Sequence, residues 1–113
     1  MKGLRKMQIM GNLTKNPELE EKGVKKTPVV NFTVAVNCNK EETIYVDCEA
    51  WSRIAQILDE YLYKGDAVFL EGKFLEPYAY ISRKNNKPGA KLKMRVEAFR
   101  FIGRSNGKHE SEK

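Results

Sequence analysis

Val29–Asn37 reads VVNFTVAVN, and the fold of this chain can be worked outward from it. Its apolar residues fall at every second position from Val30 to Val36, which is the period of a strand with one buried face. The stretch that follows alternates in the same way. Its aliphatic residues, from Ile44 to Ala50, share one face, and the other face carries Tyr45, Asp47, Glu49 and Trp51.

One amphipathic helix follows the second of these strands. Ser52 is expected to cap it, and apolar residues recur at helical spacing from Ile54 to Leu62. Lys64 and Gly65 form its C-terminal signature, because a cation suits the negative end of the helix dipole and glycine tolerates left-handed backbone. This is the only helix that we expect.

Three further strands are predicted, at Met7–Leu13, Val68–Phe74 and Leu92–Ala98, with the charged stretch Glu18–Thr27 left without one. Glu76–Ala90 is predicted to be a long basic hairpin loop. Three strands, one helix and two strands give the order of an all-β OB-fold, a five-stranded Greek-key barrel with one α-helix between strands 3 and 4. We expect one domain over residues 1–103 and a short, polar, disordered tail over 104–113.

Charge is concentrated in one segment. The net charge of +6 equals the six bases of Ser82–Arg95, which contains no acid. Such a patch attracts polyanions, above all nucleic acid, although it could also be a solvated loop that maintains solubility. With no apolar run of ~18 residues and no secretory signal, we expect a cytoplasmic protein without a membrane span.

Catalysis has little support in this sequence. It lacks a glycine-rich phosphate loop, a histidine beside a nucleophile and a metal cluster, so we expect neither an enzyme nor a cofactor. Asp47 and Glu49 are alternate acids on a half-exposed strand, which is ordinary. Cys38 and Cys48 are expected to be unpaired and buried or half-buried.

Aromatic residues favour a binding role. Single strands are held by rings on which bases stack, surrounded by cations that contact the phosphates. Tyr45 and Trp51 share a strand face by parity, and Tyr78 and Tyr80 repeat at period two beside the basic loop. Structural alternatives exist: Trp51 could be a half-buried ring at the strand–helix junction, and the tyrosines could be ordinary cross-strand residues. The core is expected to contain Phe32, Phe74 and Phe101, with Phe69 and Phe99 on the opposite face.

Three stretches resemble the bacterial single-stranded DNA-binding protein family: GNLTKNPELE (11–20), VVNFTVAVN (29–37) and YVDCEAWSRIAQILDEYLYKGDAVFLEGKF (45–74). The resemblance extends from about Met7 to Gly103. It implies an OB barrel that assembles as a homo-oligomer, a tetramer or possibly a dimer. It also implies that Trp51 and Tyr45 stack with bases, that Tyr78 or Tyr80 supplies a further aromatic, and that phosphates contact Lys6, Arg53 and Lys64.

This sequence departs from the family pattern in three places. Pro77 interrupts the start of the hairpin and cannot donate to a sheet ladder, which would bend the hairpin. Asn39-Lys40 stands where many members have another aromatic. The ending, GRSNGKHESEK, lacks the acidic, hydrophobic tip through which the family recruits replication and repair proteins. We therefore expect the DNA-coating part of the family's function, without that recruiting tip.

The resulting hypothesis is sequence-nonspecific binding and protection of single-stranded DNA in replication, recombination or repair. We expect a cytoplasmic protein that is associated with the nucleoid. Stacking is assigned to Trp51, Tyr45, Tyr78 and Tyr80. Phosphate contacts are assigned to Lys6, Lys40, Arg53, Lys64, Lys73, Arg83, Lys84, Lys87, Lys91, Lys93 and Arg95. Two alternatives stay open: a primosome-type OB adaptor whose main ligands are proteins, and an OB protein that binds single-stranded RNA.

Overall fold

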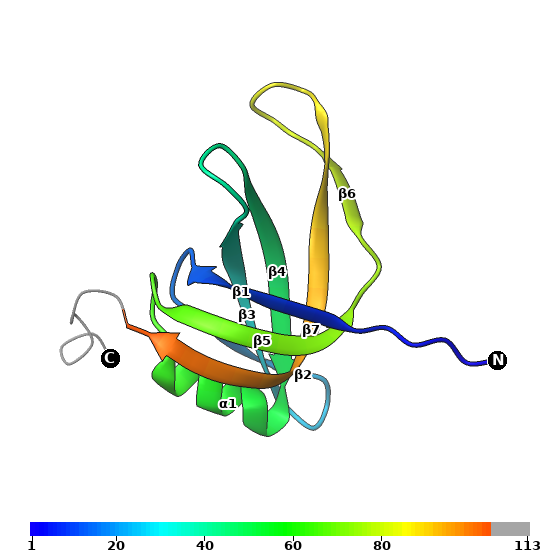
Figure 1. Ribbon diagram of the computed structural model, residues 1–113. Helices are drawn as coiled ribbons and strands as arrows, with labels where there is room; N and C mark the ends of the chain where they lie inside the picture. Colours follow the sequence, from blue (N-terminus) through cyan, green and yellow to red (C-terminus); the bar gives the residue numbers. More distant parts are fainter. Residues whose placement is uncertain (105–113) are drawn as a thin grey trace.

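The computed structural model describes residues 1–104, which fold into one helix and seven strands (Figure 1). In chain order these are β1 (Met7–Leu13), β2 (Glu18–Lys22), β3 (Thr27–Asn37), β4 (Thr43–Trp51), α1 (Ser52–Tyr61), β5 (Ala67–Phe74), β6 (Tyr78–Ile81) and β7 (Pro88–Gly103). Of the predicted tail, only Arg104 is among the described residues.

Five of the strands close into a barrel. The sheet runs β1-β5-β7-β4-β3-β2, and an additional pairing of β1 with β3 completes the ring. All neighbours are antiparallel except β4 and β7, which run parallel. The helix α1 connects the third barrel strand, β4, to the fourth, β5. This is the predicted OB-fold, with β2 and β6 as two extra short strands.

Alternating aliphatic residues fill the barrel, as the strand parity predicts. The helix contributes Ala55 and Leu58, and its C-cap residue is Leu62; all three are fully buried, and the helix closes the lower end of the barrel in Figure 1. The buried cluster consists of Leu13, Val30, Phe32, Val34, Val46, Cys48, Ala50, Ala55, Leu58, Leu62, Val68, Leu70, Met94 and Val96.

The start of the helix differs from the prediction. Ser52 is not its cap: the N-cap residue is Trp51, in extended backbone, and no side chain caps the helix. Ser52 is already helical and has a φ of 57°, in the left-handed region that L-residues seldom adopt. The predicted C-terminal signature is also wrong in part: the helix ends at Tyr61 with Leu62 as an extended C-cap, and no basic residue lies in its last turn. Gly65 does adopt the expected left-handed backbone, with a φ of 90°, but in the turn that follows the helix.

Two strands were not predicted. All residues of β2 are exposed, so its sequence, ELEEK, has no alternation to reveal it. It is a strand because it pairs along β3, from Glu18 opposite Asn31 to Lys22 opposite Thr27. Similarly, β6 lies inside the predicted loop and pairs with the first residues of β7. The tip of that hairpin is therefore at Ser82–Lys87.

A β-bulge overturns the predicted parity of the last strand. Glu71 pairs with Ala98 while Gly72 pairs with Val96, so β7 gains an extra residue at Glu97. Beyond this point Phe99 packs against the core, whereas Ala98 is exposed.

Besides Ala98, four residues predicted to be buried are exposed instead. Ile44, Phe74 and Phe101 are each about two-fifths exposed, because they lie near the ends of their strands. Cys38 is exposed in the turn after β3, while Cys48 is buried, and neither forms a disulfide.

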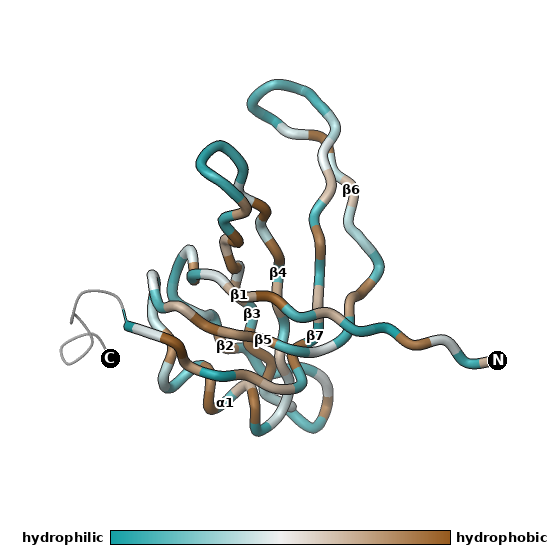
Figure 2. Tube along the Cα trace, in the orientation of Figure 1, coloured by the Kyte–Doolittle hydropathy of each residue, from teal (hydrophilic) through white to brown (hydrophobic). Residues whose placement is uncertain are grey.

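Two hairpins project from the end of the barrel opposite α1. One joins β3 to β4 and the other joins β6 to β7, and both tips are strongly hydrophilic (Figures 1 and 2). Within residues 1–104, no helix has the length and apolar character that crossing a bilayer requires.

Candidate nucleic-acid interface

The solvent face of β3, β4 and β7 brings together five of the predicted site residues, Tyr45, Trp51, Lys91, Lys93 and Arg95. Thr33 lies opposite Asp47, and Asp47 opposite Lys93. One rung further, Asn31, Glu49 and Arg95 align in the same way. Because register partners point to the same side of a sheet, the face of β4 that carries Tyr45 and Trp51 is continuous with the cations of β7.

Two hollows run along this face. One, of about 440 Å³, is lined by Tyr45 of β4, Tyr80 of β6 and Lys91 of β7. The other, of about 330 Å³, is lined by Glu49 and Lys93 and by Lys15 from the β1–β2 loop. Both are bordered by Thr33, Asp47 and Lys91, so they form one open groove that leads from the hairpins toward the middle of β4.

Tyr45 and Trp51 lie at opposite ends of the β4 face. Their six-residue separation corresponds to ~20 Å along an extended strand. Tyr45 is 56% exposed, whereas Trp51 is half-buried at the strand–helix junction. The face therefore offers two separate aromatic surfaces with polar residues between them.

The two tyrosines of β6 form a stacked pair beside the groove. The centroids of the Tyr78 and Tyr80 rings are 6.3 Å apart and their planes differ by 16°. The Lys91 ammonium lies 5.9 Å from the centre of the Tyr80 ring, within cation–π range. Tyr80 lies across Gly89 of β7, where a Cβ would come within 2.6 Å of the ring.

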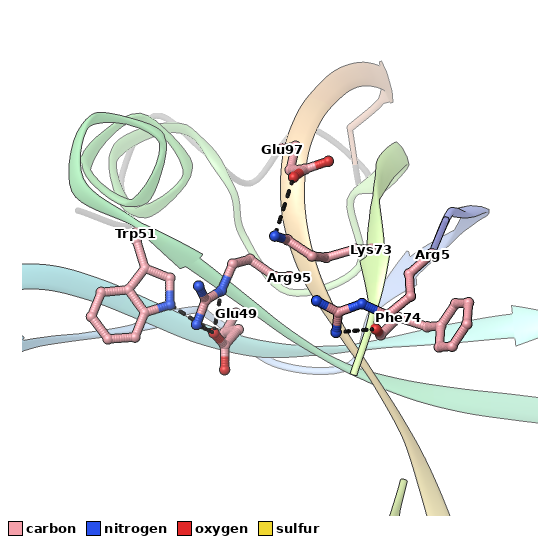
Figure 3. A network of polar contacts seen from close by, with 7 residues as sticks. All are labelled: Arg5, Glu49, Trp51, Lys73, Phe74, Arg95 and Glu97. Carbon is pink, nitrogen blue, oxygen red and sulfur yellow. Dashed lines mark hydrogen bonds and ion pairs between the residues drawn. The ribbon is translucent and has the colours of Figure 1, made fainter. Parts of the chain in front are cut away.

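Trp51 belongs to a tight polar cluster with Glu49 and Arg95 (Figure 3). Its indole Nε1 donates to Glu49 Oε2 over 2.6 Å, and Arg95 Nε donates to the same oxygen over 2.8 Å. A second guanidinium nitrogen of Arg95 is also 2.8 Å from that oxygen. The guanidinium carbon lies 5.0 Å from the centre of the Trp51 ring.

These contacts determine the charge state of Glu49. Partial burial pushes the pKa of its carboxyl upward, but the hydrogen bonds from Trp51 and Arg95 and the positive charges of Arg95 and Lys93 outweigh that effect. The net result is a pKa below the ordinary value of 4.5. Glu49 is therefore an anion at neutral pH, in the middle of a face rich in cations.

Other predicted phosphate-binding cations are also paired with acids. Lys6 lies 2.8 Å from Glu71, and this hydrogen bond and charge raise the pKa of the lysine. Lys91 lies 3.7 Å from Asp47, whose other oxygen accepts a hydrogen bond from Thr33. Lys73, the register partner of Arg95 on β5, lies 3.9 Å from Glu97.

The remaining predicted cations lie outside the face of β3, β4 and β7. Lys40 lies in the β3–β4 hairpin, and Arg83, Lys84 and Lys87 lie at the tip of the β6–β7 hairpin. Arg53 is exposed in the first turn of α1, next to Trp51. Lys64 follows the other end of α1, ~15 Å along the helix. Its backbone N–H donates to Asn16 over 2.7 Å.

Two residues near the face were not predicted to belong to it. Phe74 ends β5 with its ring 43% exposed, and Arg5 donates to the Phe74 carbonyl oxygen over 3.2 Å (Figure 3). Strand parity assigned Phe74 to the core. The signal that could have identified it is its position as the last residue before the hairpin, where the barrel no longer covers it.

The fold and this face define an OB barrel with an open aromatic and basic groove, an arrangement suited to extended polyanions. Comparison with known proteins specifies the family. Residues 4–102 match the model of the single-strand binding protein family. The chain belongs to this family, and the predicted resemblance is confirmed.

Curated relatives agree with this assignment. A single-stranded DNA-binding protein of Onion yellows phytoplasma is 36% identical over 104 residues, which cover 88% of this chain and 92% of that protein. The single-stranded DNA-binding protein 2 of Chlorobaculum tepidum is 29% identical over 112 residues, which cover 92% of this chain and 76% of that protein. The single-stranded DNA-binding protein of Malacoplasma penetrans is 28% identical, and this chain spans about half of its length, 54%.

Proposed function

We propose that this chain binds single-stranded DNA without sequence preference, by stacking bases on the β4 face and neutralising phosphates with the surrounding cations. One observation carries the proposal: Tyr45, Lys91, Lys93 and Arg95 share a single open face with Trp51 at its end. Each stacked base contributes ~1–3 kcal/mol and every base has a π-face, so such a surface is tolerant of sequence.

The hairpins extend this face. Tyr78 and Tyr80 offer a second aromatic surface, and the tip cations Arg83, Lys84 and Lys87 have no acidic partner within residues 1–104. Each neutralised phosphate releases ~0.7 counterions from a single strand, so affinity should fall steeply with salt. The proposal is binding without catalysis, in replication, recombination or repair in the cytoplasm.

Titration of a fluorescein-labelled dT oligonucleotide, followed by anisotropy, tests the proposal. Tyr45→Ala should weaken binding by about 1–3 kcal/mol. Tyr61→Ala is the matched control, because Tyr61 is similarly exposed, at 46%, but lies on α1. Equal affinities of the two variants, with both folded, would remove Tyr45 from the site.

The same assay separates the alternatives. An adaptor of the primosomal type would bind dT no more tightly than duplex DNA. An RNA-binding protein would prefer oligo-U to oligo-dT in competition, because RNA recognition uses the 2′-hydroxyl. The assembly that we propose is a homo-oligomer, a tetramer or a dimer, and light scattering with and without the oligonucleotide measures it.

A further inference from the structure

Glu49 occupies the centre of a surface that is proposed to bind an anion. Its Oε2 oxygen accepts hydrogen bonds from the indole N–H of Trp51 and the Nε–H of Arg95, and it forms an ion pair with a second guanidinium nitrogen of Arg95, all within 2.8 Å. The Glu49 side chain is only 20% exposed, compared with 42% for the Arg95 side chain. Three charge-assisted contacts on one shielded oxygen make this the strongest side-chain interaction of the face.

These contacts occupy the Arg95 guanidinium and the Trp51 ring, the two groups of this cluster that would bind DNA. A guanidinium held by a carboxylate is not available to a phosphate, because the two anions compete for the same N–H donors. The guanidinium carbon lies 5.0 Å from the centre of the Trp51 ring, so Arg95 also lies over the ring surface on which a base would stack. In the free protein, Arg95 therefore occupies the Trp51 ring in place of a base, and Glu49 pairs with Arg95 in place of a phosphate.

We propose that Glu49 is a positioning residue that holds the Arg95 guanidinium over the Trp51 ring until bound single-stranded DNA replaces these contacts. A phosphate takes the place of Glu49 as the partner of Arg95, and a base takes the place of the guanidinium on the indole. The inference rests on the proposed function and adds to it a residue that limits affinity rather than increasing it.

The other acid–cation pairs of the face do not have this geometry. Asp47 and Lys91 are 3.7 Å apart and Glu97 and Lys73 are 3.9 Å apart, and neither acid bonds an aromatic ring. The groups that face Glu49 from the neighbouring strands are Asn31, Lys93 and Arg95. Only Arg95 reaches both the carboxylate and Trp51.

Glu49→Gln tests the inference, because the amide keeps the size of the side chain and removes its charge. The freed Arg95 should raise the affinity for a labelled dT oligonucleotide about two- to fivefold, the range expected for a partly exposed ion pair. The plot of log affinity against log salt should also steepen by about 0.7, one additional phosphate. Glu60→Gln on α1 is the control, because it changes the net charge equally away from this face.

A double-mutant cycle distinguishes exchange from simple charge repulsion. If Glu49 acts through Arg95, the gain from Glu49→Gln disappears in an Arg95→Gln background. If the carboxylate only repels phosphate, the gain persists there, and the inference is overturned. A structural role alone would leave the salt slope unchanged.

The single tryptophan provides a readout without DNA. Trp51 is the only indole in the chain, so acrylamide quenching reports how accessible its ring is. Both Glu49→Gln and Arg95→Gln should increase quenching in the free protein, so the second variant serves if the first does not fold. Unchanged quenching in a folded Arg95→Gln variant contradicts the inference.

Failure of the inference is distinguishable from failure of the proposed function. If the wild-type chain does not bind the oligonucleotide, the proposed function fails. If it binds and Glu49→Gln binds equally or more weakly with an unchanged salt slope, only the role of Glu49 is refuted.

Discussion

Gly72 leaves the space in which the Arg95 carbonyl of β7 lies, and replacing Gly72 with alanine should destabilise the barrel. Gly72 is buried on β5 at the β-bulge with β7, opposite Val96. A Cβ at this position would meet the Arg95 carbonyl, with 2.9 Å to its carbon, and the Glu97 nitrogen at 3.1 Å. Both neighbours are backbone atoms of a strand that is hydrogen-bonded on both sides, to β4 and to β5.

The magnitude follows from these distances. Carbon atoms pack at about 3.5–4.0 Å, so the contact with the Arg95 carbon alone requires β7 to move by roughly 0.6–1 Å, and the carbonyl oxygen, which lies nearer, requires more. Overpacking of this kind costs about 1–3 kcal/mol, and here the backbone cannot rotate away as a side chain would. The Gly→Ala change returns about 0.4–1 kcal/mol through the entropy of the unfolded chain. Because the Arg95 carbonyl oxygen lies nearer still than its carbon, we take the upper end of the overpacking cost, about 3 kcal/mol, and expect a net loss of about 2 kcal/mol, which lowers the Tm by roughly 8–16 °C for a domain of this size.

Thermal unfolding followed by circular dichroism measures this change. Gly103→Ala is the matched control at the end of β7, since a Cβ there meets nothing within 4 Å. The control should change stability by less than about 0.5 kcal/mol. A Gly72→Ala protein that melts within 2 °C of the wild type (roughly 0.5 kcal/mol at most) would show that the reasoning about the bulge is wrong.

Three further predictions follow from buried groups. Leu58→Ala should lose about 2–5 kcal/mol in urea unfolding, because a fully buried leucine of α1 leaves a cavity at the base of the barrel. Ellman's reagent should titrate Cys38 in the folded protein and Cys48 only after unfolding, because burial raises the pKa of the Cys48 thiol and shields it. The lowered pKa of Glu49 contributes stability above pH 4.5 that is lost as the pH falls through its folded-state value. Glu49→Gln should therefore flatten the acid side of the stability profile, and an unchanged profile would contradict this assignment.

Strand parity predicted the parts of the fold in which one strand face is buried. The alternation in β3 and β4 placed Phe32, Val46 and Cys48 in the core, and the helix between β4 and β5 specified the OB topology. The exposed strand β2 has no buried face, so pairing with β3 determines it and no local pattern reveals it. The bulge at Glu97 depends on Gly72, a residue distant in sequence, and it reverses the parity of Ala98 and Phe99.

The sequence predicted that Tyr45 and Trp51 share one face of β4, but not which side chains contact them. Parity alone aligned Tyr45 with Trp51 on β4. The contact of Arg95 with Glu49 and Trp51 depends on the parallel register of β4 and β7, which joins strands separated by the helix, β5 and β6. No local pattern encodes that register, and so Glu49 was interpreted as an ordinary exposed acid. The predicted tail from residue 105 lies outside the residues that the structure describes.

We propose that bases stack on Trp51 at the end of the β4 face, and the fluorescence of this single indole reports such stacking. Wild-type protein should be titrated with a dT oligonucleotide while the Trp51 emission and the anisotropy of a labelled oligonucleotide are recorded in parallel. We expect saturable quenching that follows the anisotropy, is relieved by salt and is absent with duplex DNA. Full binding by anisotropy with unchanged Trp51 emission would contradict it.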